Sequence, residues 1–272
     1  AAAAAAAATA PAPAVDAPLV IGVLPNIAAP ALLAQYDHLK RYLERVGPQK
    51  VRIVVPVGFK PFFDATMRGD YDVAVAAPHF ARVAQLDRGM VPIALYEPRI
   101  NALLIAPADG KVGAVRDVAG KQVAFANPTS LVAMYGMQWL SQQKLEAGRD
   151  FDVKAARSDM GVGRMMLSGE AAAAVMSHGE MRALPADESA RMKVVEVFAR
   201  IPNFVVLAHP RLSQERMAQL RNQFKGFMAG QEEGLAFAQA TGLTGIVDAD
   251  EAVLKELDPY ADATRKAMGV GK

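Results

Sequence analysis

The 272-residue sequence contains no cysteine, and charge of neither sign is in clear excess. The absence of cysteine excludes disulfide bonds, thiolate metal ligands and cysteine nucleophiles. Thirty Lys and Arg residues against 28 Asp and Glu residues leave a formal charge of +2. This balance gives no reason to expect nucleic acid or an anionic membrane as a partner. No apolar run approaches the roughly 20 residues that a membrane-spanning helix requires.

Apolar residues make up 52% of the chain, which is enough to build a sizeable core. Residues 1–17 differ from the rest because they are low-complexity alanine and proline. Such a segment predicts a flexible lead-in. Small residues also surround the cleavage points of signal peptides. We therefore expect an exported protein, with the signal peptide itself not present in this chain.

From residue 19 onward, short apolar runs alternate with helical patterns. The runs 19–24, 51–57 and 72–77 are each nearly continuous in apolar residues, and each is followed by a segment with helical spacing. Repeated strand–helix units with apolar strands predict mainly parallel sheets that are covered by helices on both faces. The segment from residue 212 to the end is predicted to be helical.

Two segments, 92–105 and 194–208, each contain two apolar strands with no helix between them. We interpret them as two crossings between separate lobes. The first lobe then comprises residues 18–98 plus 204–272, and the second lobe comprises residues 99–203. A cleft between the lobes would be bordered by the carboxyl ends of the strands, which is where α/β sheets bind ligands.

A weak internal repeat places a histidine after one strand in each lobe. Residues 68–79 and 168–178 share a helix-ending glycine, an acidic residue, a strand of small residues and a final histidine. Pro78-His79 and Ser177-His178 would therefore face the cleft from opposite lobes. The two imidazoles could bind one ligand, and binding would then depend on pH. They could instead share a metal ion, or each could be a polar cap at a loop.

The stretch "KQVAFANPTSLVAMYGMQWL" (121–140) has an apolar strand that meets Asn127-Pro128-Thr129-Ser130 before a helix. A helix start presents free N–H groups and the positive end of its dipole, so it can hold a small anion. Thr and Ser are also ordinary helix-capping residues. The segment is therefore either a ligand-facing helix start or a capped helix only.

Four segments in this order resemble a known family: "LVIGVLPN", "MRGDYDVAVAAP", "VRDVAGKQVAFANPTS" and "VFARIPNFVVLAHPRLS". The chain resembles the phosphate, phosphite and phosphonate type of periplasmic substrate-binding proteins that serve ABC transporters. The resemblance implies a type II periplasmic binding protein, which is an α/β fold of two lobes and two hinge crossings. It also implies a protein that closes on a small ligand without catalysis.

The resemblance extends to the site residue by residue, with departures. The family has an aromatic residue after the second strand, and Phe59 matches that position without a Tyr hydroxyl. The phosphonate-binding helix start of the family reads Ser-Thr-Ser-Gly. Here Ser130 is kept, and Leu131, Val132 and Ala133 replace the other residues. Two hydroxyl donors are missing, and each hydrogen bond to an anion contributes on the order of 1.5–3 kcal/mol.

Further departures lie at the two following strand ends. Asp159 stands where phosphonate binders often carry His, and Ser177 and His178 stand where they carry acidic residues. The complete set of expected ligand-binding residues is Asn26, Phe59, Lys60, Pro78, His79, Asn127, Thr129, Ser130, Ser158, Asp159, Ser177 and His178. We expect no catalytic residue, no cofactor and no resident metal.

The expected function is capture of a small solute, an oxyanion or phosphonate-like compound, for an ABC transporter in the periplasm. The expected partners are the ligand and the transporter permease, and the expected state is a monomer without nucleic acid. One alternative is a ligand-sensing module for a membrane receptor or histidine kinase. Another is a different ligand, a metal or an organic acid, because the phosphonate hydroxyl motif is incomplete. No HExxH, P-loop or strand-linked GxGxxG motif indicates an enzyme.

Overall fold

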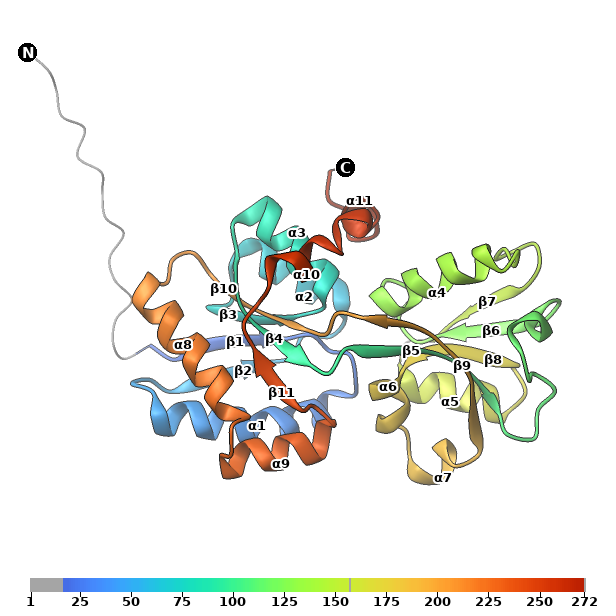
Figure 1. Cartoon of the computed structure of the whole chain (residues 1–272), viewed down its shortest axis with the longest axis horizontal. Coiled ribbons are helices and arrows are strands. Elements are labelled where there is room, and N and C mark those ends of the chain that lie inside the picture. The colour runs from blue at the N-terminus through green and yellow to red at the C-terminus, as the bar shows by residue number, and fades with distance from the viewer. Residues whose placement is uncertain (1–16, 157, 272) are drawn as a thin grey trace, which may run out of the picture.

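The computed structural model describes residues 17–156 and 158–271 and shows two α/β lobes joined by crossing strands (Figure 1). The lead-in expected over residues 1–17 therefore lies outside the described residues, apart from Ala17. The first lobe contains a six-stranded sheet in the order β11-β4-β10-β3-β1-β2, and the second a five-stranded sheet in the order β7-β6-β8-β5-β9. The strands are β1 (Leu19–Val23), β2 (Val51–Val54), β3 (Val73–Ala76), β4 (Val91–Glu97), β5 (Ile100–Pro107), β6 (Gln122–Phe125), β7 (Asp152–Ala155), β8 (Ala173–Ser177), β9 (Met192–Ile201), β10 (Val205–Ala208) and β11 (Gly245–Val247).

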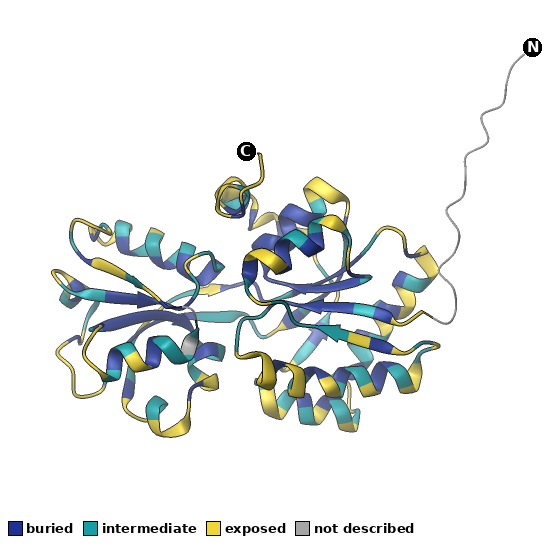
Figure 2. Cartoon of the chain, turned by 180° about the vertical axis from the view of Figure 1, so that it is seen from behind, coloured by how far each residue is buried: buried dark blue, intermediate teal, exposed yellow. Residues whose placement is uncertain are grey.

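Helices cover both faces of each sheet, as the apolar strands require (Figures 1 and 2). Their bounds are α1 (Ala29–Val46), α2 (Phe59–Arg68), α3 (Pro78–Arg88), η1 (Val115–Val118), α4 (Leu131–Gln142), α5 (Asp159–Leu167), α6 (His178–Ala183), α7 (Ala186–Ser189), α8 (Gln214–Phe227), α9 (Glu232–Thr241), α10 (Glu251–Lys255) and α11 (Asp258–Ala267). In the first lobe, α1, α8 and α9 pack on one face and α2 and α3 on the other. In the second lobe, α4 packs on one face and α5 on the other.

The two crossings determine the directions of the strands. β1, β2 and β3 are parallel, and β4 runs the same way because β10 is antiparallel to both β3 and β4. The chain therefore leaves the first lobe at the edge where these strands end. β5 enters the second lobe where β8 ends, so it must run antiparallel to β8, and Ala102 pairs with Ser177. β9 returns antiparallel to β5, with Ile201 opposite Ile100.

The two-lobed α/β fold is confirmed, and two details differ from the sequence-based expectation. Both sheets are mixed rather than mainly parallel, because the strands that enter a lobe from the cleft oppose those that end there. β11 interrupts the C-terminal segment that was expected to be helical, and it pairs with β4. The predicted divisions at 98/99 and 203/204 fall in the short links between β4 and β5 and between β9 and β10.

The C-terminal helix α11 contacts both lobes. On the first lobe, Arg265 pairs with Asp87 of α3 at 2.8 Å. On the second lobe, the Tyr260 ring stacks on Tyr135 of α4 with 4.6 Å between ring centroids. The Tyr260 hydroxyl also donates to Gln138 at 2.7 Å. The helix therefore contacts both lobes across the gap between them.

Close packing of α4 on β8 generates the first prediction. A Cβ atom at Gly136 would lie 2.8 Å from Cγ1 of Val175, so Gly136→Val must displace the buried strand. We expect the free energy of unfolding to fall by about 2 kcal/mol, as overpacking of a core does. Gly113→Val is the control, because the nearest atom there is 3.8 Å away. Equal urea midpoints for the two variants would contradict the close approach of α4.

Candidate functional site

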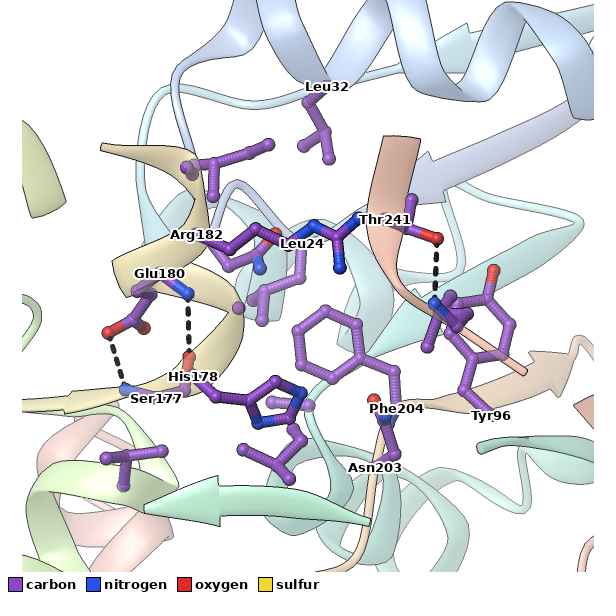
Figure 3. A pocket seen from close by; sticks show the side chains of 18 of the residues that line it. Leu24, Leu32, Tyr96, Ser177, His178, Glu180, Arg182, Asn203, Phe204 and Thr241 are labelled. Atoms are coloured by element: carbon purple, nitrogen blue, oxygen red, sulfur yellow. Dashed lines mark hydrogen bonds between the residues drawn. The ribbon is translucent and has the colours of Figure 1, made fainter. Parts of the chain in front are cut away.

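A cavity of about 150 Å³ lies between the lobes and is lined by residues from both (Figure 3). Leu24 and Asn26 follow β1, and Phe59 and Pro78 begin α2 and α3. The second lobe contributes the starts of α4 and α6. The cavity therefore lies where strands of both lobes end, as the sequence predicts for a ligand site. Six of the predicted residues line it, namely Asn26, Phe59, Pro78, Ser130, Ser177 and His178.

Several other predicted residues have structural partners and are not among the lining residues. Lys60 is exposed and pairs with Asp64 on its own helix at 2.7 Å. Ser158 caps α5 by accepting a hydrogen bond from Gly161 N. Asn127 has a φ of 109°, so its role is to form the turn between β6 and α4 in a backbone region that Asn tolerates better than most residues. The side chain of Asp159 lies outside the described residues.

His79 connects the two lobes from behind the lining of the cavity. Its side chain is fully buried, and its Nε2 lies 3.0 Å from the carbonyl oxygen of Thr129 in the second lobe. A carbonyl oxygen only accepts hydrogen bonds, so in the neutral ring Nε2 carries the proton and Nδ1 carries a lone pair. That Nδ1 atom is buried without a hydrogen-bond partner. Burial lowers the pKa of His79 to about 4, although the hydrogen bond to Thr129 opposes the shift.

His178 directs a hydrogen-bond donor toward the cavity. The backbone N–H of Asn101 donates to Nδ1 of His178 at 2.9 Å. In the neutral ring the proton is therefore on Nε2, and the ring extends from α6 toward Phe204 (Figure 3). The sequence places the two histidines correctly at matching strand ends, but only His178 lines the cavity.

The start of α4 supplies further donors. Ser130 Oγ accepts a hydrogen bond from Ala133 N at 3.1 Å, and its own hydroxyl proton remains able to donate. The amide groups of Leu131 and Val132 belong to the first helical turn, which has no intrahelical acceptors. The side chains of Leu131 and Val132 form part of the cavity wall. The NPTS segment is therefore a capped helix start whose Ser130 also lines the cavity.

The start of α6 is held by a capping box. Ser177 Oγ accepts from Glu180 N at 3.0 Å, and Glu180 accepts from Ser177 N at 3.2 Å. Figure 3 shows that this keeps the carboxylate of Glu180 beside the helix start. The arrangement fixes the backbone from which His178 and Arg182 extend into the cleft.

Arg182 and Phe204 are lining residues that the sequence analysis missed. Arg182 reaches across the cleft, where Nη2 donates to the carbonyl oxygen of Gln239 on α9 at 2.9 Å (Figure 3). Within the described part of the chain, no carboxylate lies within ion-pair distance of its guanidinium. Phe204 lies in the return crossing, between β9 and β10, and its ring lies between His178 and Arg182 in Figure 3. The sequence could have indicated Phe204, because the crossing that contains it borders the predicted cleft.

The first lobe contributes a neutral wall. The hydroxyls of Tyr36 and Tyr96 are 3.0 Å apart, and both rings are buried. Burial raises the pKa of both phenols above the ordinary value, so neither provides charge. Among the described residues, no three His, Asp or Glu side chains gather as a metal site would require. In the same residues, no helix has the length and apolarity to span a bilayer.

The fold and the cleft define a two-lobed solute-binding protein. Solved structures with this fold include the binding component of a phosphonate ABC transporter from Pseudomonas aeruginosa, with 16% identity, a TM-score of 0.77, and coverage of 93% of this chain and 89% of that one. PhnD1 from Prochlorococcus marinus, solved with methylphosphonate, has 10% identity, a TM-score of 0.78 and coverage of 92% and 98%. The aliphatic sulphonate-binding protein SsuA from Escherichia coli has 15% identity, a TM-score of 0.66 and coverage of 93% and 94%. At these identities the likeness shows the fold alone.

The family itself is shown by sequence. The profile of the periplasmic substrate-binding proteins of phosphonate ABC transporters matches residues 21–254, and the chain belongs to this family. No curated protein matches the chain in sequence. The family membership confirms the resemblance and the periplasmic solute-binding function that were predicted from the sequence.

The burial of His79 generates a prediction about pH. His79 is neutral in the closed cleft. When the lobes part, we expect its pKa to return to about 6.5, so that below this pH it gains a proton on opening. The free energy of closure is therefore most favourable above about pH 6.5, and it becomes less favourable as pH falls toward 4. We expect ligand affinity to fall about tenfold from about pH 7.5 to about pH 5.5, as measured by calorimetry. This sign is opposite to that of a histidine that binds an anion directly.

His79→Gln provides the control for this prediction. Glutamine can still donate to the carbonyl of Thr129, but it does not titrate in this range. Its affinity should therefore not show the fall below about pH 6.5 that His79 causes. A pH trend that persists unchanged in His79→Gln would place the titrating group elsewhere.

Proposed function

We propose that the cleft captures a small solute with an oxyanion group and that the closed protein delivers it to the permease of an ABC transporter. The observation that carries this proposal is a set of hydrogen-bond donors from the second lobe around one cavity. Ser130 at the α4 start, the Nε2 proton of His178 and the guanidinium of Arg182 can all donate to a ligand. An anion satisfies these groups, whereas a cation would not.

The proposal also covers the hinge positions, the oligomeric state and the absence of catalysis. The lobes move about the crossings at 98/99 and 203/204, the protein acts as a monomer and it performs no catalysis. The cross-lobe hydrogen bonds of His79 and Arg182 support closure about those crossings. A role as the ligand-sensing module of a membrane receptor or histidine kinase is not favoured by the family. Export would place the protein in the periplasm, where such transporters collect solutes.

A thermal-shift screen tests the class of ligand. The panel contains phosphate, phosphite, sulfate, methanesulfonate and acetate, with choline as a cationic control. An oxyanion present at about 100 times its Kd should stabilise the folded protein by about 2.7 kcal/mol. The proposal predicts that at least one anion raises the midpoint and that choline does not. Stabilisation by choline alone would contradict it.

A separate prediction concerns methylphosphonate. Leu131 and Val132 replace hydroxyl-bearing residues of the family pattern at the α4 start, and a phosphonate head group loses hydrogen-bond donors there. Each missing hydrogen bond to an anion costs on the order of 1.5–3 kcal/mol. We expect weak or undetectable binding of simple alkylphosphonates by calorimetry. Sub-micromolar affinity for methylphosphonate would contradict this expectation.

A further inference from the structure

The cavity has mostly apolar walls, and the side chains that carry its charges, Glu180 and Arg182, come from the second lobe. Among the described lining residues, the apolar side chains come from both lobes and from the return crossing. They include Leu24, Leu32, Phe59, Leu131, Val132 and Phe204. A cavity of about 150 Å³ with apolar walls is large enough to hold a group of the size of benzene.

The charge of the cavity is the second observation. Arg182 is the one fixed cation among the described lining residues, and Glu180 is the one carboxylate. The carboxylate of Glu180 accepts from Ser177 N at the positive start of α6, so the guanidinium of Arg182 is the group that meets a negative charge of the ligand. Leu131 and Val132 replace the hydroxyls that would support a second charge. The polar groups therefore suit a monoanion better than a dianion.

The positions of these groups separate the two ends of the site. His178 and Ser130 belong to the second lobe, and Arg182 crosses from that lobe to Gln239. Phe204 lies between His178 and Arg182 in Figure 3, and Leu24 lines the same cavity from the first lobe. A ligand with a polar head against the second lobe would place its remaining atoms against apolar side chains.

We propose that the natural ligand is an amphipathic monoanion, an oxyanion head that carries an aryl or short alkyl group buried between the lobes. This inference rests on the proposed function, and it goes further by assigning most of the cavity to an apolar substituent. The change from hydroxyl to aliphatic side chains at Leu131 and Val132 then has a positive role. It builds the wall against which that substituent packs.

The experiment is calorimetry with a homologous series of sulfonates, which share one monoanionic head. The probes are methane-, ethane-, propane- and butanesulfonate, with benzenesulfonate as the aryl member. Each methylene that leaves water should strengthen binding about fourfold. Affinity should therefore rise about sixtyfold from methane- to butanesulfonate, and benzenesulfonate should bind more tightly than methanesulfonate. An affinity that is flat or falls along the series overturns the inference.

Inorganic sulfate and phosphate separate this inference from the proposed function. If either binds more tightly than every organic sulfonate, the amphipathic ligand is excluded while oxyanion capture stands. If no anion binds and choline does, both proposals fail. 1-Butanol tests the head group, because it offers the apolar chain without the charge and should bind far more weakly than butanesulfonate.

Val132→Thr tests the wall directly, because it keeps the shape of the side chain and replaces one methyl group with a hydroxyl. We expect the ratio of butanesulfonate to methanesulfonate affinity to fall at least threefold in this variant. Val153→Thr makes the same change on exposed β7, outside the cavity, and should leave the ratio unchanged. An unchanged ratio in Val132→Thr would show that this wall does not contact the substituent.

Arg182→Gln tests the head group from the protein side. It should weaken butanesulfonate at least tenfold while leaving the dependence on chain length intact. Arg191→Gln is the matched control, since Arg191 is exposed and is not among the lining residues. Equal affinities in the two variants would remove Arg182 from the site.

Discussion

The double crossing of the chain is the constraint on which the rest of the structure depends. A strand that leaves one lobe at the cleft must enter the other from the cleft, so it opposes the strands that end there. β3 and β8 therefore both end at the same gap, and the helices that follow them begin in it. Helix starts expose unsatisfied N–H groups, so the topology alone places donors on both sides of one cavity. The particular side chains then decide which ligand uses those donors.

Closure of the cleft involves few and individually weak contacts. The His79–Thr129 and Arg182–Gln239 hydrogen bonds each contribute on the order of 1 kcal/mol, and stacking of Tyr260 on Tyr135 adds a similar amount. The desolvated Nδ1 of His79 opposes closure, because a buried polar atom without a partner is costly. A small balance of this kind can be shifted by one ligand, which is what a capture protein requires.

Much of the fold is readable from local patterns, because apolar runs and helical spacing reflect burial. The crossings were recognisable because two strands follow each other without a helix at 92–105 and at 194–208. β11 was not, since its three residues are too few to show a period. The strand directions were also misjudged in part, because the pairing of β5 with β8 depends on how the chain enters the second lobe.

Some residues of the candidate site could likewise be predicted from the sequence, and others could not. Ser130, Ser177 and His178 follow strand ends, so their position in the sequence predicts their place in the cleft. Arg182 has no local signal, because its role depends on the approach of α9 from the other lobe. His79 was predicted to line the cleft, but it is not among the lining residues of the cavity. Its position at a strand end is visible in the sequence, but the direction of its ring is determined by packing.

The replacement of hydroxyls by aliphatic side chains changes what drives closure. Hydrogen bonds to an anion are directional, and they discriminate by the position of each oxygen. Burial of an apolar group between Phe204 and the α4 wall is non-directional, and it depends on area and volume. For the ligand class that we propose, the guanidinium of Arg182 and the imidazole of His178 would orient the head group, and apolar contact would provide most of the gain in free energy. A cleft of this composition selects by size and by one charge, which relaxes the geometric demand on the head group and tightens the demand on the substituent.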